Sequence, residues 1–119
     1  MIEANIITTA EYYELIKESH QTKNFIGLVG KNLSLVRFEK KSFGRSGLNL
    51  TKTVLSELDL SEFSCTGAIL NEANLDNSDL YLAALSHVKF KNASLKNVDL
   101  RRANSVSYTH LTLPTTPYV

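Results

Sequence analysis

The 119-residue sequence has no tryptophan, one cysteine, one methionine and two prolines. With Cys65 as its single cysteine the chain cannot form an internal disulfide, which suits a protein of a reducing compartment. No apolar run approaches the roughly 18 residues of a membrane helix. The N-terminus also lacks the basic and then apolar order of a signal peptide. We therefore expect a cytoplasmic protein with no membrane partner.

The sequence also lacks an excess of positive or of negative charge. The formal net charge is +1, and residues 46–104 carry six Lys/Arg against seven Asp/Glu, so no strong field attracts nucleic acid. There is no glycine-rich phosphate loop, paired metal-ligand spacing or nucleophile elbow. His20, His87 and His110 lie in three different segments. The sequence predicts no enzyme activity, no cofactor, no metal site and no nucleic-acid partner.

The first segment, residues 1–32, contains a helix signal. Thr8 and Glu11 have the spacing of a capping box, in which each side chain accepts a hydrogen bond from a free backbone N–H at the helix start. Apolar side chains follow at amphipathic-helix spacing, at Tyr12, Leu15 and Ile16. We expect a short helix that ends near residues 19–22, followed by a capping segment.

The second segment, residues 33–104, repeats every five residues, most clearly over 48–104. Read from residue 48, the units are LNLTK, TVLSE, LDLSE, FSCTG, AILNE, ANLDN, SDLYL, AALSH, VKFKN, ASLKN and VDLRR, followed by AN. Their eleven middle positions hold nine Leu, one Cys and one Phe. Two residues before each middle position stands another apolar or small residue, and the other positions are mostly polar.

A five-residue period fits neither a helix nor a straight strand, because it would scatter the leucines over several faces. It fits a chain that turns a corner every five residues and points two side chains of each unit inward. Four corners close a coil, and successive coils stack at roughly 4.8 Å, so each residue lies over the one twenty positions earlier. This stacking predicts an interior column of Leu55, Leu75 and Leu95, with larger and smaller side chains alternating elsewhere.

These units resemble the pentapeptide-repeat family, whose units read Ala-Asp/Asn-Leu followed by two polar residues. The best matches are Ala73-Asn74-Leu75, Ser78-Asp79-Leu80, Leu58-Asp59-Leu60, Val98-Asp99-Leu100 and Ala103-Asn104. The resemblance implies an all-β fold, a right-handed quadrilateral β-helix, here preceded by the short α-helix.

The earliest units, at Leu33, Phe38 and Phe43, match less well because they place Lys40 and Arg45 at middle positions. Two alternatives remain open at this point. Either the coil starts near residue 48, or its first turn is irregular and leaves these charged side chains at its open end.

The third segment, residues 105–119, breaks the period. Its run VSYTHLTLPTT resembles a translated sequencing adapter, so we expect an artefactual tail and a natural sequence that continues beyond Asn104. The alternative is a native β-like tail. If the last coil leaves an unpaired edge, the chain will tend to associate end to end with other copies.

The spacing of twenty stacks Asp59, Asp79 and Asp99 on one face of the coil. Three like charges at β spacing repel one another unless something compensates. One interpretation is that each carboxylate accepts backbone N–H groups at its own corner. The other is an acidic strip for a basic partner, partly neutralised by nearby arginines. The candidate interaction face comprises Asp59, Asp79, Asp99, Tyr81, Arg101 and Arg102.

The absence of catalytic motifs and the presence of a surface-presenting repeat favour a non-enzymatic scaffold for protein–protein interaction. The alternative comes from the resemblance, since some family members imitate DNA and protect DNA gyrase. The balanced charge of residues 46–104 departs from that pattern.

Overall fold

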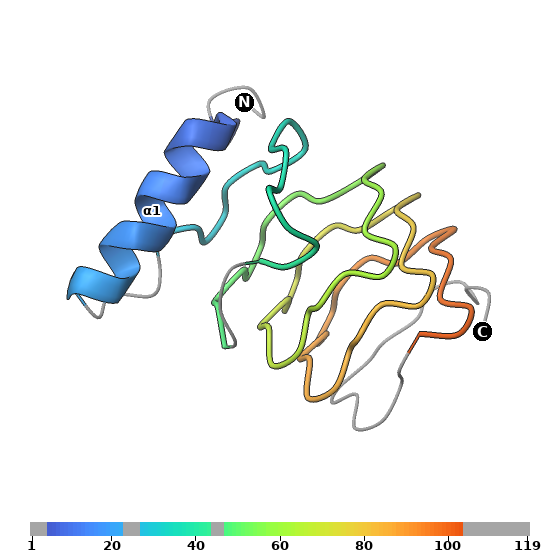
Figure 1. Ribbon diagram of the computed structural model, residues 1–119. Coiled ribbons are helices and arrows are strands. Elements are labelled where there is room, and N and C mark those ends of the chain that lie inside the picture. Colours follow the sequence, from blue (N-terminus) through green and yellow to red (C-terminus); the bar gives the residue numbers. More distant parts are fainter. Residues whose placement is uncertain (1–4, 23–26, 44–46, 104–119) are drawn as a thin grey trace.

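The computed structural model describes residues 5–22, 27–43 and 47–103. Within these ranges it contains one helix, α1 (Thr9–Thr22), and a coil whose turns lie side by side. Helix α1 lies at one end of the stack of turns (Figure 1). Residues 104–119, which include the expected artefactual tail, lie outside the described residues.

Helix α1 begins with the predicted capping box. The Thr8 N–H donates to Glu11 Oε1 at 2.8 Å, and the Glu11 N–H donates to Thr8 Oγ1 at 3.1 Å. These two bonds satisfy backbone donors that have no partner within the helix. Tyr12 and Ile16 are buried, and Leu15 is partly buried, as the helical spacing predicts.

The coil repeats every twenty residues. Parallel bridges join three columns of residues at this spacing, Asn49–Ile69–Lys89, Val54–Asn74–Ser94 and Asp59–Asp79–Asp99, together with the pair Ser64–Ala84. Each corner contributes one bridged residue, and after the next, middle residue two turn residues follow. A corner every five residues leaves no room for consecutive ladder positions. The described coil is therefore built from isolated parallel bridges, without extended strands.

The core lies inside the coil, where the five-residue period placed it. Every middle position from Leu50 to Leu100 is at most 4% exposed, and the Leu55, Leu75 and Leu95 column is completely buried. Positions two residues earlier are buried as well, except for the partly buried Leu58. Burial of these apolar side chains is the main stabilising contribution to such a coil.

Each corner is a turn that requires left-handed backbone. The fifth residue of every unit has a positive φ, between 58° and 63° at ten non-glycine positions and 76° at Gly67. The next N–H closes the turn onto a middle-position carbonyl, as Thr53 N does onto Leu50 O at 3.2 Å. A positive φ at the second central residue is the signature of a type II turn.

The coil before Leu48 runs two residues out of register. Its bridges, Asn32–Val54 and Ser42–Ser64, each join residues 22 apart. Leu33 therefore lies opposite the middle-position Leu55, while Leu35 is 65% exposed. Lys40 is exposed, and Arg45 lies outside the described residues. Of the two alternatives, the structure shows an irregular first turn.

Helix α1 closes this end of the coil through aromatic side chains. Tyr12 Oη donates to Phe43 O at 2.6 Å, and the Tyr12 ring meets Phe38 edge-on at 5.1 Å between centroids. Phe63 in turn contacts Phe38 and Phe43, with centroids 5.2 and 4.8 Å away. The interior is thus covered by rings at its N-terminal end.

Candidate interaction face

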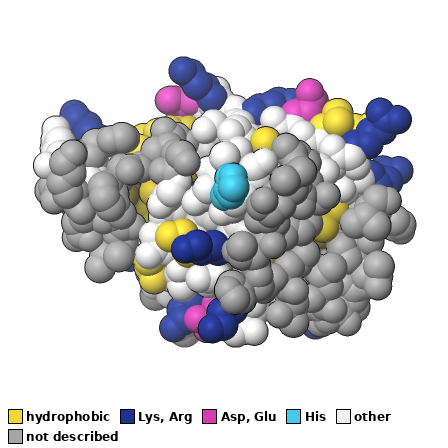
Figure 2. Space-filling model, turned by 90° about the horizontal axis from the view of Figure 1, so that it is seen from below, with side chains coloured by type: hydrophobic (Ala, Val, Ile, Leu, Met, Phe, Trp, Pro, Cys, Tyr) yellow, Lys and Arg dark blue, Asp and Glu magenta, His cyan; other side chains and the backbone are white. Residues whose placement is uncertain are grey.

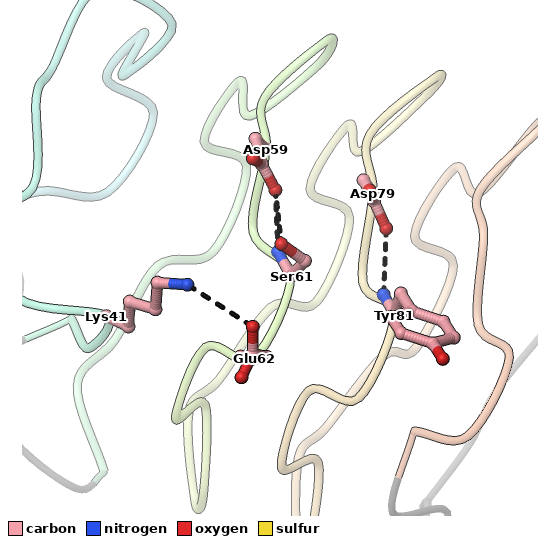
Figure 3. Close-up of polar contacts among 6 residues, drawn as sticks. All are labelled: Lys41, Asp59, Ser61, Glu62, Asp79 and Tyr81. Atoms are coloured by element: carbon pink, nitrogen blue, oxygen red, sulfur yellow. Dashed lines mark hydrogen bonds and ion pairs between the residues drawn. The ribbon is translucent and has the colours of Figure 1, made fainter.

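The third face of the coil consists of residues 58–62, 78–82 and 98–102. The three aspartates form a bridged column on it, as predicted. The Oδ1 atom of each accepts a hydrogen bond from the backbone N–H two residues further on, at 3.0, 2.9 and 3.0 Å. Figure 3 shows this contact at Asp59 and Asp79. The structural interpretation of the column is confirmed: each carboxylate holds its own turn.

Two of these carboxylates are further stabilised in their charged form. The Ser61 hydroxyl donates to Asp59 Oδ1 at 2.6 Å and, with the Ser61 N–H, lowers the pKa of Asp59. At the other end of the column, Arg101 donates to both oxygens of Asp99 at 3.0 and 2.8 Å and lowers the pKa of that carboxyl. Hydrogen bonds to the carboxylate thus offset repulsion along the column.

An aromatic and apolar group lies at the centre of the third face. Leu82 is 43% exposed, and Tyr81 beside it is half-buried. The Arg101 guanidinium carbon lies 5.6 Å from the Tyr81 ring centroid, within the range of a cation–π contact. Arg102 is exposed next to it. The structure therefore brings Tyr81, Arg101 and Asp99 into one connected group, with Asp79 holding the turn beneath the tyrosine.

The N-terminal edge of the third face is hollowed. A cavity of about 280 Å³ lies between the first turn and the coil that follows it, lined by Val36, Arg37, Phe38, Lys40, Lys41, Leu58, Asp59, Leu60, Ser61 and Phe63. We call it the coil gap. Lys41 reaches across to Glu62, with Nζ 3.5 Å from Oε2 (Figure 3). Both side chains are well exposed, so this ion pair contributes little stability.

Sequence reasoning missed the lysines and Arg37 at this gap. The signal was present in Lys40, whose charge at a middle position broke the inward pattern. By itself, this charge indicates an irregular coil and does not indicate a site. The basic side chains also extend the candidate face by one coil beyond Asp59.

The described ranges contain no group of three His, Cys, Asp or Glu residues placed to hold a metal ion. His87 is exposed, while the side chain of His20 and all of His110 lie outside the described part. Cys65 is 2% exposed, and burial raises the pKa of its thiol to about 12, so it is a structural side chain.

Comparison with known proteins identifies the repeat. The family model of pentapeptide repeats matches eight copies, over residues 49–86 and 78–104. These residues belong to the pentapeptide-repeat family. Their matched range coincides with the regular coil of twenty-residue turns, while the irregular first turn lies ahead of it.

A solved structure is also similar to this chain. It is the crystal structure of a pentapeptide repeat protein from the cyanobacterium Cyanothece 51142. The two sequences are 20% identical, and the match covers 76% of this chain and 86% of that one with a TM-score of 0.31. No curated protein matches the chain significantly. Among the residues that the structure describes, no helix is long and apolar enough to cross a membrane.

Proposed function

We propose that the pentapeptide-repeat coil is a non-enzymatic scaffold, a right-handed quadrilateral β-helix that binds a protein partner through its third face. The observation that carries this proposal is the group at the centre of that face, in which half-buried Tyr81 lies beside exposed Leu82 and Arg101. Aromatic residues and arginine are enriched in protein interfaces, and apolar centres with polar rims are their usual anatomy.

The rigidity of the coil supports this role. The backbone beneath Tyr81 is held by the Asp79 carboxylate at 2.9 Å and by bridges to the coils on either side. The Arg101 side chain is already oriented by its two bonds to Asp99. A partner therefore meets side chains that are largely ordered before binding, which lowers the entropic cost of association.

DNA mimicry receives less support. The column of aspartates engages backbone N–H groups of its own turns, and Arg101 partly neutralises it. In the view from below in Figure 2, the acidic and basic side chains of the described residues lie in mixed groups near the margins of the molecule. A mimic needs dense negative charge over a continuous surface. We accordingly expect no effect of this chain on DNA gyrase.

Photocrosslinking tests the proposal. A benzophenone amino acid replaces Leu82 on the third face or, as a control, Lys89, an exposed residue on the first face, which consists of residues 48–52, 68–72 and 88–92. We expect a captured protein from host extract at position 82 but not at 89. Capture should be lost with Tyr81→Ser and kept with Lys91→Ser, which changes the same position of a unit on the first face.

Other results count against the proposal. Equal capture at both positions indicates nonspecific contact, and capture that survives Tyr81→Ser places the interface elsewhere. No capture at position 82 under any condition contradicts a protein-binding role for this face.

A further inference from the structure

The ladder between coils is interrupted at one corner of the third face. The first turn pairs with the next coil at Asn32–Val54 and again at Ser42–Ser64. At the same offset of 22, Arg37 falls opposite Asp59. Within the described residues no bridge joins these two, although Asp59 is bridged to Asp79 on its other side.

Helix α1 holds the first turn beside this interruption. The Arg37 N–H donates to Thr9 Oγ1 at 2.9 Å, and the Glu39 N–H donates to Tyr13 Oη at 2.7 Å. The helix thus takes up backbone donors of the first turn at the corner where the ladder stops. The coil gap lies between this part of the first turn and the coil that follows it. Leu58, which lines the gap, is only partly buried.

The interruption leaves an open ladder position at Asp59, in the coil that follows the first turn. At the neighbouring corners, the Val54 N–H donates to Lys31 O at 3.0 Å and the Ser64 N–H donates to Lys41 O at 2.7 Å. Among the described residues the corresponding N–H of Asp59 has no such acceptor, and its C=O receives no N–H from the first turn. An extended chain that entered the gap would find one backbone donor and one backbone acceptor side by side.

The charged side chains around the gap determine whether an acidic or a basic chain would bind there. Arg37 and Lys40 are exposed, and neither side chain forms an ion pair within the described part of the chain. Lys41 is paired with Glu62, and Asp59 has its carboxylate turned to Ser61. The two unpaired cations therefore attract an anionic group, while Phe38 and Leu58 provide an apolar wall.

We propose that the coil gap binds an extended acidic peptide segment of a partner protein. This inference deepens the proposed scaffold function and rests on it. The peptide backbone pairs with the N–H and C=O of Asp59 as an added bridge, an apolar side chain contacts Phe38 and Leu58, and acidic side chains meet Arg37 and Lys40.

Titration with a defined peptide tests the proposal on the full chain. The probe is the capped peptide Glu-Val-Glu-Val-Glu, compared with its neutral analogue Gln-Val-Gln-Val-Gln, and binding is followed by the amide NMR signals of labelled protein. We expect the acidic peptide to shift the Asp59 N–H signal and to bind more weakly as salt is added. Arg37→Gln with Lys40→Gln should raise Kd roughly tenfold.

The matched control is Lys89→Gln with Lys91→Gln, which removes two exposed lysines from the first face and should leave Kd unchanged. Three outcomes overturn the inference: equal binding of the neutral peptide, signal shifts away from the gap, or the same shifts with inorganic phosphate, which indicate a small-anion site. If crosslinking at position 82 still captures a partner while this peptide fails to bind, only the coil-gap inference is refuted.

Discussion

The core column at Leu75 offers a quantitative test of the coil. Leu75 is completely buried between Leu55 and Leu95, one coil away on either side. Shortening a fully buried leucine to alanine removes its apolar burial and leaves a cavity, which costs about 3–5 kcal/mol in a core that cannot collapse. Native proteins in general have a free energy of unfolding of only about 5–15 kcal/mol. Leu75→Ala should therefore unfold at a much lower urea concentration, and Leu75→Asp should not fold.

The matched control is Lys96→Ala, an outward position of the neighbouring coil on the same face, which should change stability by no more than about 0.5 kcal/mol. Urea unfolding followed by circular dichroism measures both variants. Comparable losses from Leu75→Ala and Lys96→Ala would refute the inward and outward assignment. Asp76 is a poorer control than its outward position suggests, because its Oδ1 accepts bonds from Ser94 Oγ and Lys96 N.

Three further predictions concern the cap, the thiol and the aspartate column. Tyr12→Phe removes the bond to Phe43 O at 2.6 Å and should cost about 1–3 kcal/mol in urea unfolding, whereas an unchanged midpoint contradicts this helix contact. Cys65 should resist a thiol reagent in the folded protein and react fully in guanidinium, and rapid native labelling would show that it is not buried. The pKa of Asp59 is lowered on folding, so its contribution is present above the unfolded value and is lost as pH falls through the lowered one. Asp59→Asn keeps the turn acceptor, so its stability should fall less between pH 7 and pH 3 than that of the natural chain, as compared by urea midpoints.

The five-residue period was sufficient to predict the regular coil because burial alone decides which positions point inward. Leu75 and its column follow directly from the spacing, and the turn-holding role of Asp59 follows from the chemistry of aspartate at corners. The capping box at Thr8 could be predicted because it joins residues only three positions apart. Each of these features depends on residues close in sequence or on a strict repeat.

The coil gap could not be predicted in this way. Leu33 and Leu35 are both suited to an inward position, so composition did not reveal the two-residue shift of the first turn. The first turn beside the gap is also held by hydrogen bonds between residues 28 and 26 positions apart, at Arg37 and Glu39, which no local pattern encodes. Contacts between a helix and a turn so distant in the sequence are not visible in a local pattern.

Hydrogen exchange at the backbone N–H of Asp59 tests most directly whether the ladder between the coils has this open position. In the free protein, we predict that the N–H groups of Val54, Ser64 and Asp79 are protected, because each donates to the preceding coil at 2.7–3.0 Å. The N–H of Asp59 should exchange much faster than these three, since no backbone acceptor faces it across the gap in the described residues. Protection of Asp59 equal to that of Val54 and Ser64 would show a continuous ladder and would contradict both the gap and the site built on it.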